Sequence, residues 1–138
     1  MRSVVLIPTY NEIDSLPSAL DRVRSAAVQA HILVIDDNSP DGTGALADAR
    51  AQSDDHIHVL HRTEKNGLGP AYLAGFKWAL ENDFELIIEM DADGSHRAED
   101  LALLIQRAEM ADKPDLVIGS RWISGGATQG WSQKRVLL

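Results

Sequence analysis

The sequence predicts an α/β protein in which a mostly parallel sheet is covered by helices on both faces. Short apolar runs rich in Val and Ile alternate along the chain with longer segments whose apolar residues recur at helical spacing. This alternation is typical of strands joined by crossover helices, and ligands of such folds bind outside the carboxyl ends of the strands. The chain has 138 residues, of which 44% are hydrophobic, enough for a core of its own. We therefore expect one domain over residues 1–138.

The predicted elements follow one another along the chain. The strands are residues 4–7, 32–35, 57–60, 86–90 and 116–118. The helices are residues 16–27, 44–52, 68–79 and 101–108. Pro17 opens the first helix, with Asp14 or Ser15 as its cap, and the second helix is the weakest of the set. The resulting order is β-α-β-α-β-α-β-α-β, followed by a glycine-containing loop over residues 124–133.

Composition narrows the range of functions. Thirteen Lys and Arg against 21 Asp and Glu give a net charge of −8, so neither nucleic-acid binding nor strong attraction to an anionic bilayer is expected. The absence of cysteine excludes disulfides, thiol catalysis and Cys-ligated zinc, and it is compatible with a reducing cytoplasm. No run approaches the roughly 18 apolar residues that a spanning helix needs, so membrane contact is expected to be peripheral.

The triplet Asp91-Ala92-Asp93 ends the fourth predicted strand. Backbone alternation turns its two carboxylates to one side, where they repel each other unless a cation lies between them. Mg2+ or Mn2+ meets that need, because hard cations take one or two carboxylates together with substrate phosphate oxygens. The competing interpretation is an exposed turn that caps a helix beginning near Arg97, and the triplet alone only slightly favours a metal site at Asp91 and Asp93.

A second acidic pair, Asp36 and Asp37, follows the second predicted strand. In isolation the pair is more typical of a polar turn that leads to Gly42. Its placement favours a ligand site instead, because both acidic pairs, Glu12 and Arg121 all follow predicted strands. Parallel strands bring their carboxyl ends to one edge of a sheet, so we expect these side chains to share one crevice.

Three basic residues are candidates for binding phosphate groups. Arg121 can hold a diphosphate through a two-pronged, charge-assisted contact worth about 1.5–3 kcal/mol. Lys134 and Arg135 form an adjacent basic pair that suits an acceptor phosphate or lipid head groups as well as it suits a solvated surface.

Several familiar motifs are absent. Tyr72 stands where the third glycine of the dinucleotide fingerprint belongs, and neither a Walker lysine pattern nor a hydrolase nucleophile elbow is present. His56, His58 and His61 lie in or beside the third predicted strand, but no carboxylate completes a recognisable metal-ligand spacing. We therefore assign these histidines surface positions and no function.

Several segments together carry a family pattern. They are residues 5–12 (VLIPTYNE), 34–43 (VIDDNSPDGT), 67–72 (GLGPAY), 90–96 (MDADGSH), 119–121 (GSR) and 131–135 (WSQKR). The pattern spans nearly the whole chain and resembles the polyprenol (dolichol) monophosphate mannose synthases of bacterial type. These are inverting family 2 glycosyltransferases with the Rossmann-like GT-A fold. The Gly-Leu-Gly segment and the final segment are the ones that indicate mannosyl transfer to a polyprenyl phosphate.

The resemblance implies GDP-mannose as donor and a polyprenyl phosphate lipid as acceptor. The residues that it places around the donor are Pro8, Tyr10, Glu12, Ile35, Asp37, Asp91, Ala92, Asp93 and Arg121. Asp91 and Asp93 would hold Mg2+ or Mn2+, and Asp93 and Arg121 would act in catalysis. Some relatives have Gln at the position of Ser95, which leaves the identity of the metal open.

The family continues beyond residue 138, and an apolar run begins at residues 136–138. We therefore expect a chain truncated at its C-terminal end, with room for a membrane-anchoring domain or subunit. The resemblance also implies a cytoplasmic location, peripheral at the inner face of the membrane.

Transfer with inversion needs no dedicated base here, because a phosphate monoester with a second pKa of about 6 is already largely ionised at pH 7. Other functions fit parts of the pattern. UDP-glucose is an alternative donor, since no residue alone discriminates the base or the sugar. A haloacid-dehalogenase-like phosphatase also has an apolar strand that ends in Asp-x-Asp-Gly, although that strand normally opens the domain. A non-catalytic nucleotide-sugar-binding module is the third alternative.

Overall fold

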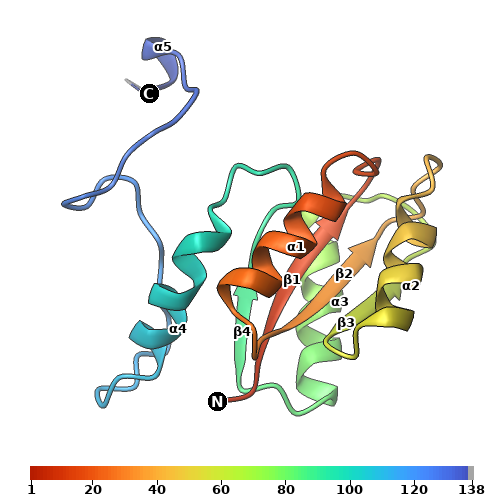
Figure 1. The fold of residues 1–138 in the computed structure, drawn as a ribbon, viewed down its shortest axis with the longest axis horizontal. Helices are drawn as coiled ribbons and strands as arrows, with labels where there is room; N and C mark the ends of the chain where they lie inside the picture. The colour runs from red at the N-terminus through yellow and green to blue at the C-terminus, as the bar shows by residue number, and fades with distance from the viewer. Residues whose placement is uncertain (137–138) are drawn as a thin grey trace.

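The computed structural model describes residues 1–136 and has the predicted α/β architecture (Figure 1). Its sheet has four strands in the order β3-β2-β1-β4, and all neighbouring strands pair in parallel. The strands are β1 (Ser3–Thr9), β2 (His31–Asp36), β3 (Ile57–His61) and β4 (Leu86–Glu89). The chain steps outward from β1 to β3 and then returns to the other side of β1. The strand order therefore reverses between β1 and β4, which is where open parallel sheets form a crevice for ligands.

The four predicted helices occur in the predicted order, as α1 (Leu16–Ala26), α2 (Thr43–Ser53), α3 (Leu68–Glu81) and α4 (Leu101–Ala108). A 3-10 turn η1 (Ala98–Asp100) before α4 and a short helix α5 (Gln133–Val136) were not predicted. α1, α2 and α4 pack on one face of the sheet and α3 packs on the other (Figure 1). This distribution follows from right-handed crossovers, because the return from β3 to β4 runs in the opposite direction across the sheet.

Both faces of the central strand β1 are buried, which makes it the middle of the core. Val5 and Ile7 face α1, whereas Val4 and Leu6 face α3, and all four side chains are fully buried. Burial of a Val, Leu or Ile side chain stabilises a fold by about 1.5–3 kcal/mol. β1 is thus anchored in the core through both of its faces.

The start of α1 differs in one detail from the prediction. Ser15 occupies the cap position and Pro17 lies in the first turn, but the Ser15 hydroxyl makes no hydrogen bond to the helix backbone. It donates instead to Oε2 of Glu12 at 2.7 Å. The predicted cap residue therefore fixes an acidic side chain at the end of β1.

The predicted fifth strand, residues 116–118, is wrong. These residues form no strand, and Leu116 and Ile118 are 74% and 75% exposed. A strand needs a neighbour to satisfy its backbone groups, and after α4 the chain leads away from the sheet toward α5 (Figure 1). An apolar run of this length has no periodicity that distinguishes a paired strand from an unpaired segment. Of the apolar run predicted at 136–138, residues 137 and 138 lie outside the described residues.

No helix within residues 1–136 combines the length and the apolar character needed to span a bilayer.

Candidate functional site

The predicted site residues after β1, β2 and β4 are brought to one edge of the sheet. Tyr10 follows β1, Asp37 follows β2 and Asp91 lies two residues beyond β4. The parallel register carries β1 and β2 to their carboxyl ends together, with Thr9 opposite Asp36. This edge is therefore the candidate functional site.

The two acidic neighbours after β2 have different surroundings. Asp36 is 2% exposed and is surrounded by donors. Its carboxylate accepts hydrogen bonds from the Thr9 hydroxyl at 2.8 Å, from the Ser39 hydroxyl at 2.6 Å and from the Ser39 backbone N–H at 3.1 Å. Asp36 thus fastens β1 to the turn after β2, which is the structural role predicted for a polar turn at this pair.

Asp37 is also buried, at 5% exposure, but it retains a free acceptor. Its Oδ1 atom lies 3.3 Å from Nη1 of Arg62, close enough for an ion pair, yet it receives no aligned hydrogen bond within the described residues. Burial raises the pKa of the Asp37 carboxyl more than the neighbouring Arg62 lowers it. A buried acceptor without a donor is unusual in folded proteins and indicates a position where a ligand's donor fits.

The loop after β4 holds its two carboxylates on either side of a buried anchor. Ala92 is 3% exposed and packs in the core with α1 and α4. Asp93 is exposed, and its Oδ1 accepts a hydrogen bond from the Ser95 backbone N–H at 2.9 Å. Hydrogen bonds from Ser95 lower the pKa of the Asp93 carboxyl. The predicted turn is therefore present, and the carboxylate of Asp93 remains exposed.

Asp91 is contacted from its own loop and from α3. Its backbone N–H donates to Nδ1 of His96 at 3.0 Å, and its Oδ2 lies 3.5 Å from the Ser95 hydroxyl and 3.8 Å from Nε2 of His96. Its Oδ1 accepts from the Tyr72 hydroxyl at 3.4 Å. Burial, followed by the nearby Asp91 charge, raises the pKa of Tyr72, which remains a neutral donor. The side chain of Asp91 is thus held without being neutralised by Arg or Lys.

The chemistry of these donors fits a hard divalent cation. Asp91 and Asp93 supply oxygen ligands, and Mg2+ or Mn2+ takes one or two carboxylates and completes its shell with water and phosphate oxygens. Among residues 1–136, no group of three or more His, Cys, Asp or Glu side chains is arranged to hold a metal ion alone. The two carboxylates therefore suit a metal that is shared with a phosphate ligand.

Arg121 reaches the same loop even though the strand predicted before it does not form. Its Nη2 donates to the Ser95 carbonyl at 2.9 Å, and its guanidinium lies 4.8 Å from the ring centre of Trp131. The guanidinium of Arg135 lies 4.2 Å from the centre of the same ring, whereas Lys134 is exposed on α5. Trp131 therefore links the basic pair to Arg121, although the pair itself is not at the sheet edge.

The remaining predicted donor residues lie in or directly after β1 and β2. Pro8 and Ile35 are buried within these strands, and the side chain of Ile35 packs in the core against α3. Tyr10 is half-buried with Nζ of Lys65 at 4.4 Å from its ring centre. Glu12 is partly buried and held by Ser15.

Sequence reasoning missed the contribution of the β3–α3 segment, residues 62–72. Arg62 pairs with Asp37, Lys65 covers Tyr10 and Tyr72 donates to Asp91, so this segment touches three predicted donor residues. Tyr72 belongs to the GLGPAY pattern, but that pattern does not reveal its partner Asp91. The one signal available was that the segment follows the carboxyl end of a strand.

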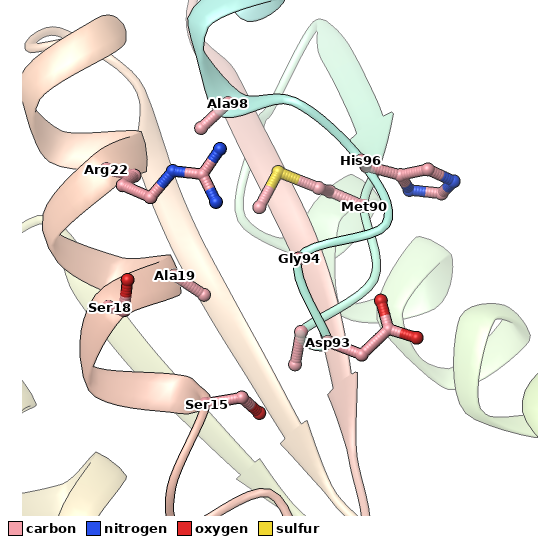
Figure 2. A pocket seen from close by; sticks show the side chains of 10 residues that line it. Ser15, Ser18, Ala19, Arg22, Met90, Asp93, Gly94, His96 and Ala98 are labelled. Atoms are coloured by element: carbon pink, nitrogen blue, oxygen red, sulfur yellow. The ribbon is translucent and has the colours of Figure 1, made fainter. Parts of the chain in front are cut away.

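A pocket of about 210 Å3 lies on the other side of the loop, against α1 (Figure 2). Figure 2 shows the Arg22 side chain reaching from α1 toward the loop, whereas the side chains of Asp93 and His96 point away from the helix. Arg22 makes hydrogen bonds of 3.1 and 2.9 Å to the carboxylate of Glu99. Asp93, Gly94 and His96 of the loop line this pocket together with Arg22, so the pocket borders the candidate site from the side of α1.

Comparison with known proteins assigns this arrangement to a family. The model of glycosyl transferase family 2 matches residues 4–137. The chain is 52% identical over 138 residues to the undecaprenyl-phosphate mannosyltransferase of Micrococcus luteus, covering 100% of the chain and 56% of that protein. It is also 52% identical to the polyprenol monophosphomannose synthase of Mycolicibacterium smegmatis, covering 99% of the chain and 51% of that protein. The chain therefore spans about half the length of these curated relatives.

A solved structure agrees with the fold. The mannosyltransferase PcManGT from Pyrobaculum calidifontis, in complex with GDP-Man and Mn2+, is similar with a TM-score of 0.68 and 25% sequence identity. The similarity covers 80% of this chain and 33% of that one. The GT-A architecture expected from the sequence is thereby confirmed.

Proposed function

Because the chain belongs to glycosyl transferase family 2, we propose that it is the donor-binding part of a mannosyltransferase that moves mannose from GDP-mannose to a polyprenyl phosphate. The observation that supports the proposal is that carboxylate oxygens without hydrogen-bond donors among the described residues lie at the carboxyl edge of the sheet, beside the point where the strand order reverses. Asp91 and Asp93 follow β4 at this reversal, and Asp37, which retains a buried acceptor, follows β2 at the same sheet edge. The two relatives that are 52% identical support mannose as the sugar and a polyprenyl phosphate as the acceptor.

The nucleoside of the donor would lie at the carboxyl ends of β1 and β2. Oδ1 of Asp37 would accept a hydrogen bond from the base, which satisfies the buried oxygen and makes binding of the correct donor favourable. Pro8 and Ile35 would support this edge of the sheet from within β1 and β2, with Tyr10 and Glu12 beside the nucleoside. Arg62 would hold the Asp37 carboxylate in place from the other side.

The diphosphate would lie over the loop after β4. Asp91 and Asp93 would share Mg2+ or Mn2+ with it, and the ion would stabilise charge on the departing diphosphate. Ala92 keeps the loop anchored in the core, so both carboxylates stay at the sheet edge. Arg121, already hydrogen-bonded to the loop at Ser95, would contact the diphosphate in the catalytic step.

The acceptor requires little activation by the protein. A phosphate monoester is already largely ionised at neutral pH, so we assign no general base and give Asp93 a positioning role at the donor. Lys134 and Arg135 are proposed to attract the acceptor phosphate. Since that phosphate is attached to a lipid, we propose that the protein acts at a membrane surface. We place it in the cytoplasm, at the inner face of the membrane.

The experiment that tests this proposal is a calorimetric titration of the chain with GDP in the presence of Mn2+ or of EDTA. Asp91→Asn and Asp93→Asn are each expected to abolish the part of GDP binding that depends on Mn2+, because an amide is a much weaker metal ligand than a carboxylate. Asp112→Asn is the matched control, since Asp112 is an exposed acid paired with Arg107. GDP binding by the unmodified chain that is equal with Mn2+ and EDTA would contradict the metal site.

The choice of donor is tested separately by thermal shift. GDP-mannose with Mn2+ is expected to raise the unfolding midpoint more than UDP-glucose does. A larger shift with UDP-glucose would replace the proposed donor, and release of inorganic phosphate from a phosphomonoester would instead support a phosphatase.

A further inference from the structure

We propose that Tyr72 is a positioning residue that orients the carboxylate of Asp91 for the metal ion. The inference rests on the proposed function, which makes Asp91 a ligand of that ion. Its basis is the contact between the Tyr72 hydroxyl and Oδ1 of Asp91 at 3.4 Å. This distance is long for an O–H···O hydrogen bond, and such contacts commonly shorten when a ligand completes a site.

Tyr72 lies on a different element of the fold from the other residues that contact Asp91. Ser95 and His96 belong to the same loop as Asp91, so they move together with it. Tyr72 belongs to α3, on the opposite face of the sheet from α1. Among the described residues, its hydroxyl makes the hydrogen bond that connects the Asp91 carboxylate to a separate element of the fold.

The position of Tyr72 is fixed by close packing of α3 on the sheet. A Cβ atom added at Gly75 would lie 2.6 Å from Cδ1 of Ile35 and 2.9 Å from Cδ1 of Leu6, so the helix lies at this height because position 75 is glycine. Tyr72 is half-buried, and its ring stacks on that of Phe76 with centroids 6.4 Å apart. The hydroxyl is therefore held at a defined distance from the end of β4.

A tyrosine hydroxyl suits this role chemically. It occupies one lone pair of Oδ1 and limits rotation of the carboxylate, while the other lone pairs remain free for a cation. It brings no positive charge, so it does not repel the metal ion as Lys or Arg would at the same place. Hydrogen-bond partners that orient a metal ligand typically change metal affinity or activity by about 10–100-fold when they are removed.

The test is Tyr72→Phe, which removes the hydroxyl and keeps the ring. The Mn2+ concentration that gives half-maximal enhancement of GDP binding is expected to rise about tenfold. The affinity for GDP in EDTA and the unfolding midpoint are expected to stay unchanged. A role in packing alone would not produce this separation, because the ring and its contact with Phe76 are preserved.

Phe76→Leu is the matched control on the same helix face. It is expected to lower the unfolding midpoint and to leave the half-maximal Mn2+ concentration unchanged. If Tyr72→Phe has the Mn2+ dependence of the unmodified chain, the inference is overturned and the proposed function stands. If the unmodified chain itself shows no Mn2+ dependence, the metal site of the proposed function fails first, and the inference fails with it.

Discussion

At the carboxyl edge of the sheet, acidic side chains gather around the ends of β1, β2 and β4, whereas at the amino edge imidazoles gather around the starts of β2 and β3. The two edges differ in how these side chains are satisfied. Nδ1 of His31 lies 2.9 Å from Nε2 of His58, and the His31 ring is 4.5 Å from that of His56. Phe84 packs edge-on against His31, and Trp78 lies against His58. The histidines therefore contact one another and neighbouring aromatic rings, and they form a cluster within the protein.

The acidic edge contains the opposite arrangement. Oδ1 of Asp37 is buried without a hydrogen bond in the described chain, and Asp93 is exposed. Ionisable side chains cluster at both edges, so clustering alone does not identify a site. The distinguishing features are hydrogen-bonding capacity left for a ligand and placement at the carboxyl ends of parallel strands.

The strongest test of this comparison uses the neighbours Asp36 and Asp37. Asp37→Asn is expected to lower the affinity for GDP by about 10–100-fold, the range for a lost hydrogen bond to a charged group. Its free energy of unfolding should not decrease, because burial of the Asp37 charge outweighs the stabilisation from Arg62, which also contacts Asn66. Calorimetry with GDP and urea unfolding measure the two effects.

Asp36→Asn is the matched control, and it is expected to lower the stability of the fold rather than the affinity for GDP. Thr9 and Ser39 both donate to this carboxylate, and an amide cannot accept all of these hydrogen bonds. The free energy of unfolding is expected to fall by about 1–3 kcal/mol. Equal losses of stability and of GDP affinity in both variants would remove the distinction between a satisfied and an unsatisfied carboxylate.

The amino edge should affect stability at acid pH rather than ligand binding. Burial, and then the nearby His56 and His58, lower the pKa of His31 from 6.5 to about 4, and Arg2 and Arg24 act in the same direction. Between pH 6.5 and pH 4 the unfolded chain therefore binds more protons than the folded chain. The contribution of His31 to the free energy of unfolding is fully present above pH 6.5 and is lost as the pH decreases toward 4. The loss attributable to His31 is on the order of 2–3 kcal/mol.

His31→Asn is expected to flatten the pH dependence of the free energy of unfolding between pH 6.5 and 4, as measured by urea titration. Asp54 also faces this cluster, at 3.7 Å from His56 and 2.8 Å from Arg24, and it is unchanged in the variant. GDP affinity at pH 7.5 should match that of the unmodified chain. A loss of GDP binding would show that the two edges are not functionally separate.

Sequence periodicity predicted most of the fold because strands and helices of a parallel α/β sheet have distinct apolar patterns. It failed at residues 116–118, where a short apolar run carries no information about whether a neighbouring strand is available. The lack of a metal-ligand spacing led to the prediction that His56 and His58 lie at the surface, but both are partly buried against His31, which lies far away in the sequence. His61 is exposed as expected.

The candidate site was predictable to the extent that strand direction determines it. Asp37 and Asp91 follow strands, so their common edge could be inferred from sequence, and the family pattern supplied their roles. Their partners Arg62 and Tyr72 could not be inferred, because the contacts join residues 25 and 19 positions apart and depend on how α3 packs. Which of Asp36 and Asp37 keeps a free oxygen likewise depends on the placement of Ser39.

The smallest effect is expected at Arg22 and Glu99. They lie beside the acidic edge, but their hydrogen-bonding groups already pair with each other, so they test whether proximity alone matters. Their two hydrogen bonds join α1 to η1 at the pocket behind the loop, and both side chains are largely solvated, at 37% and 53% exposure. Exposed ion pairs contribute little, so Glu99→Gln should change GDP affinity by less than about twofold and leave the unfolding midpoint nearly unchanged. If Glu99→Gln instead weakened Mn2+-dependent GDP binding as strongly as Asp91→Asn, proximity to the loop would matter more than unmet hydrogen-bonding capacity, and the pocket against α1 would have to be counted as part of the donor site.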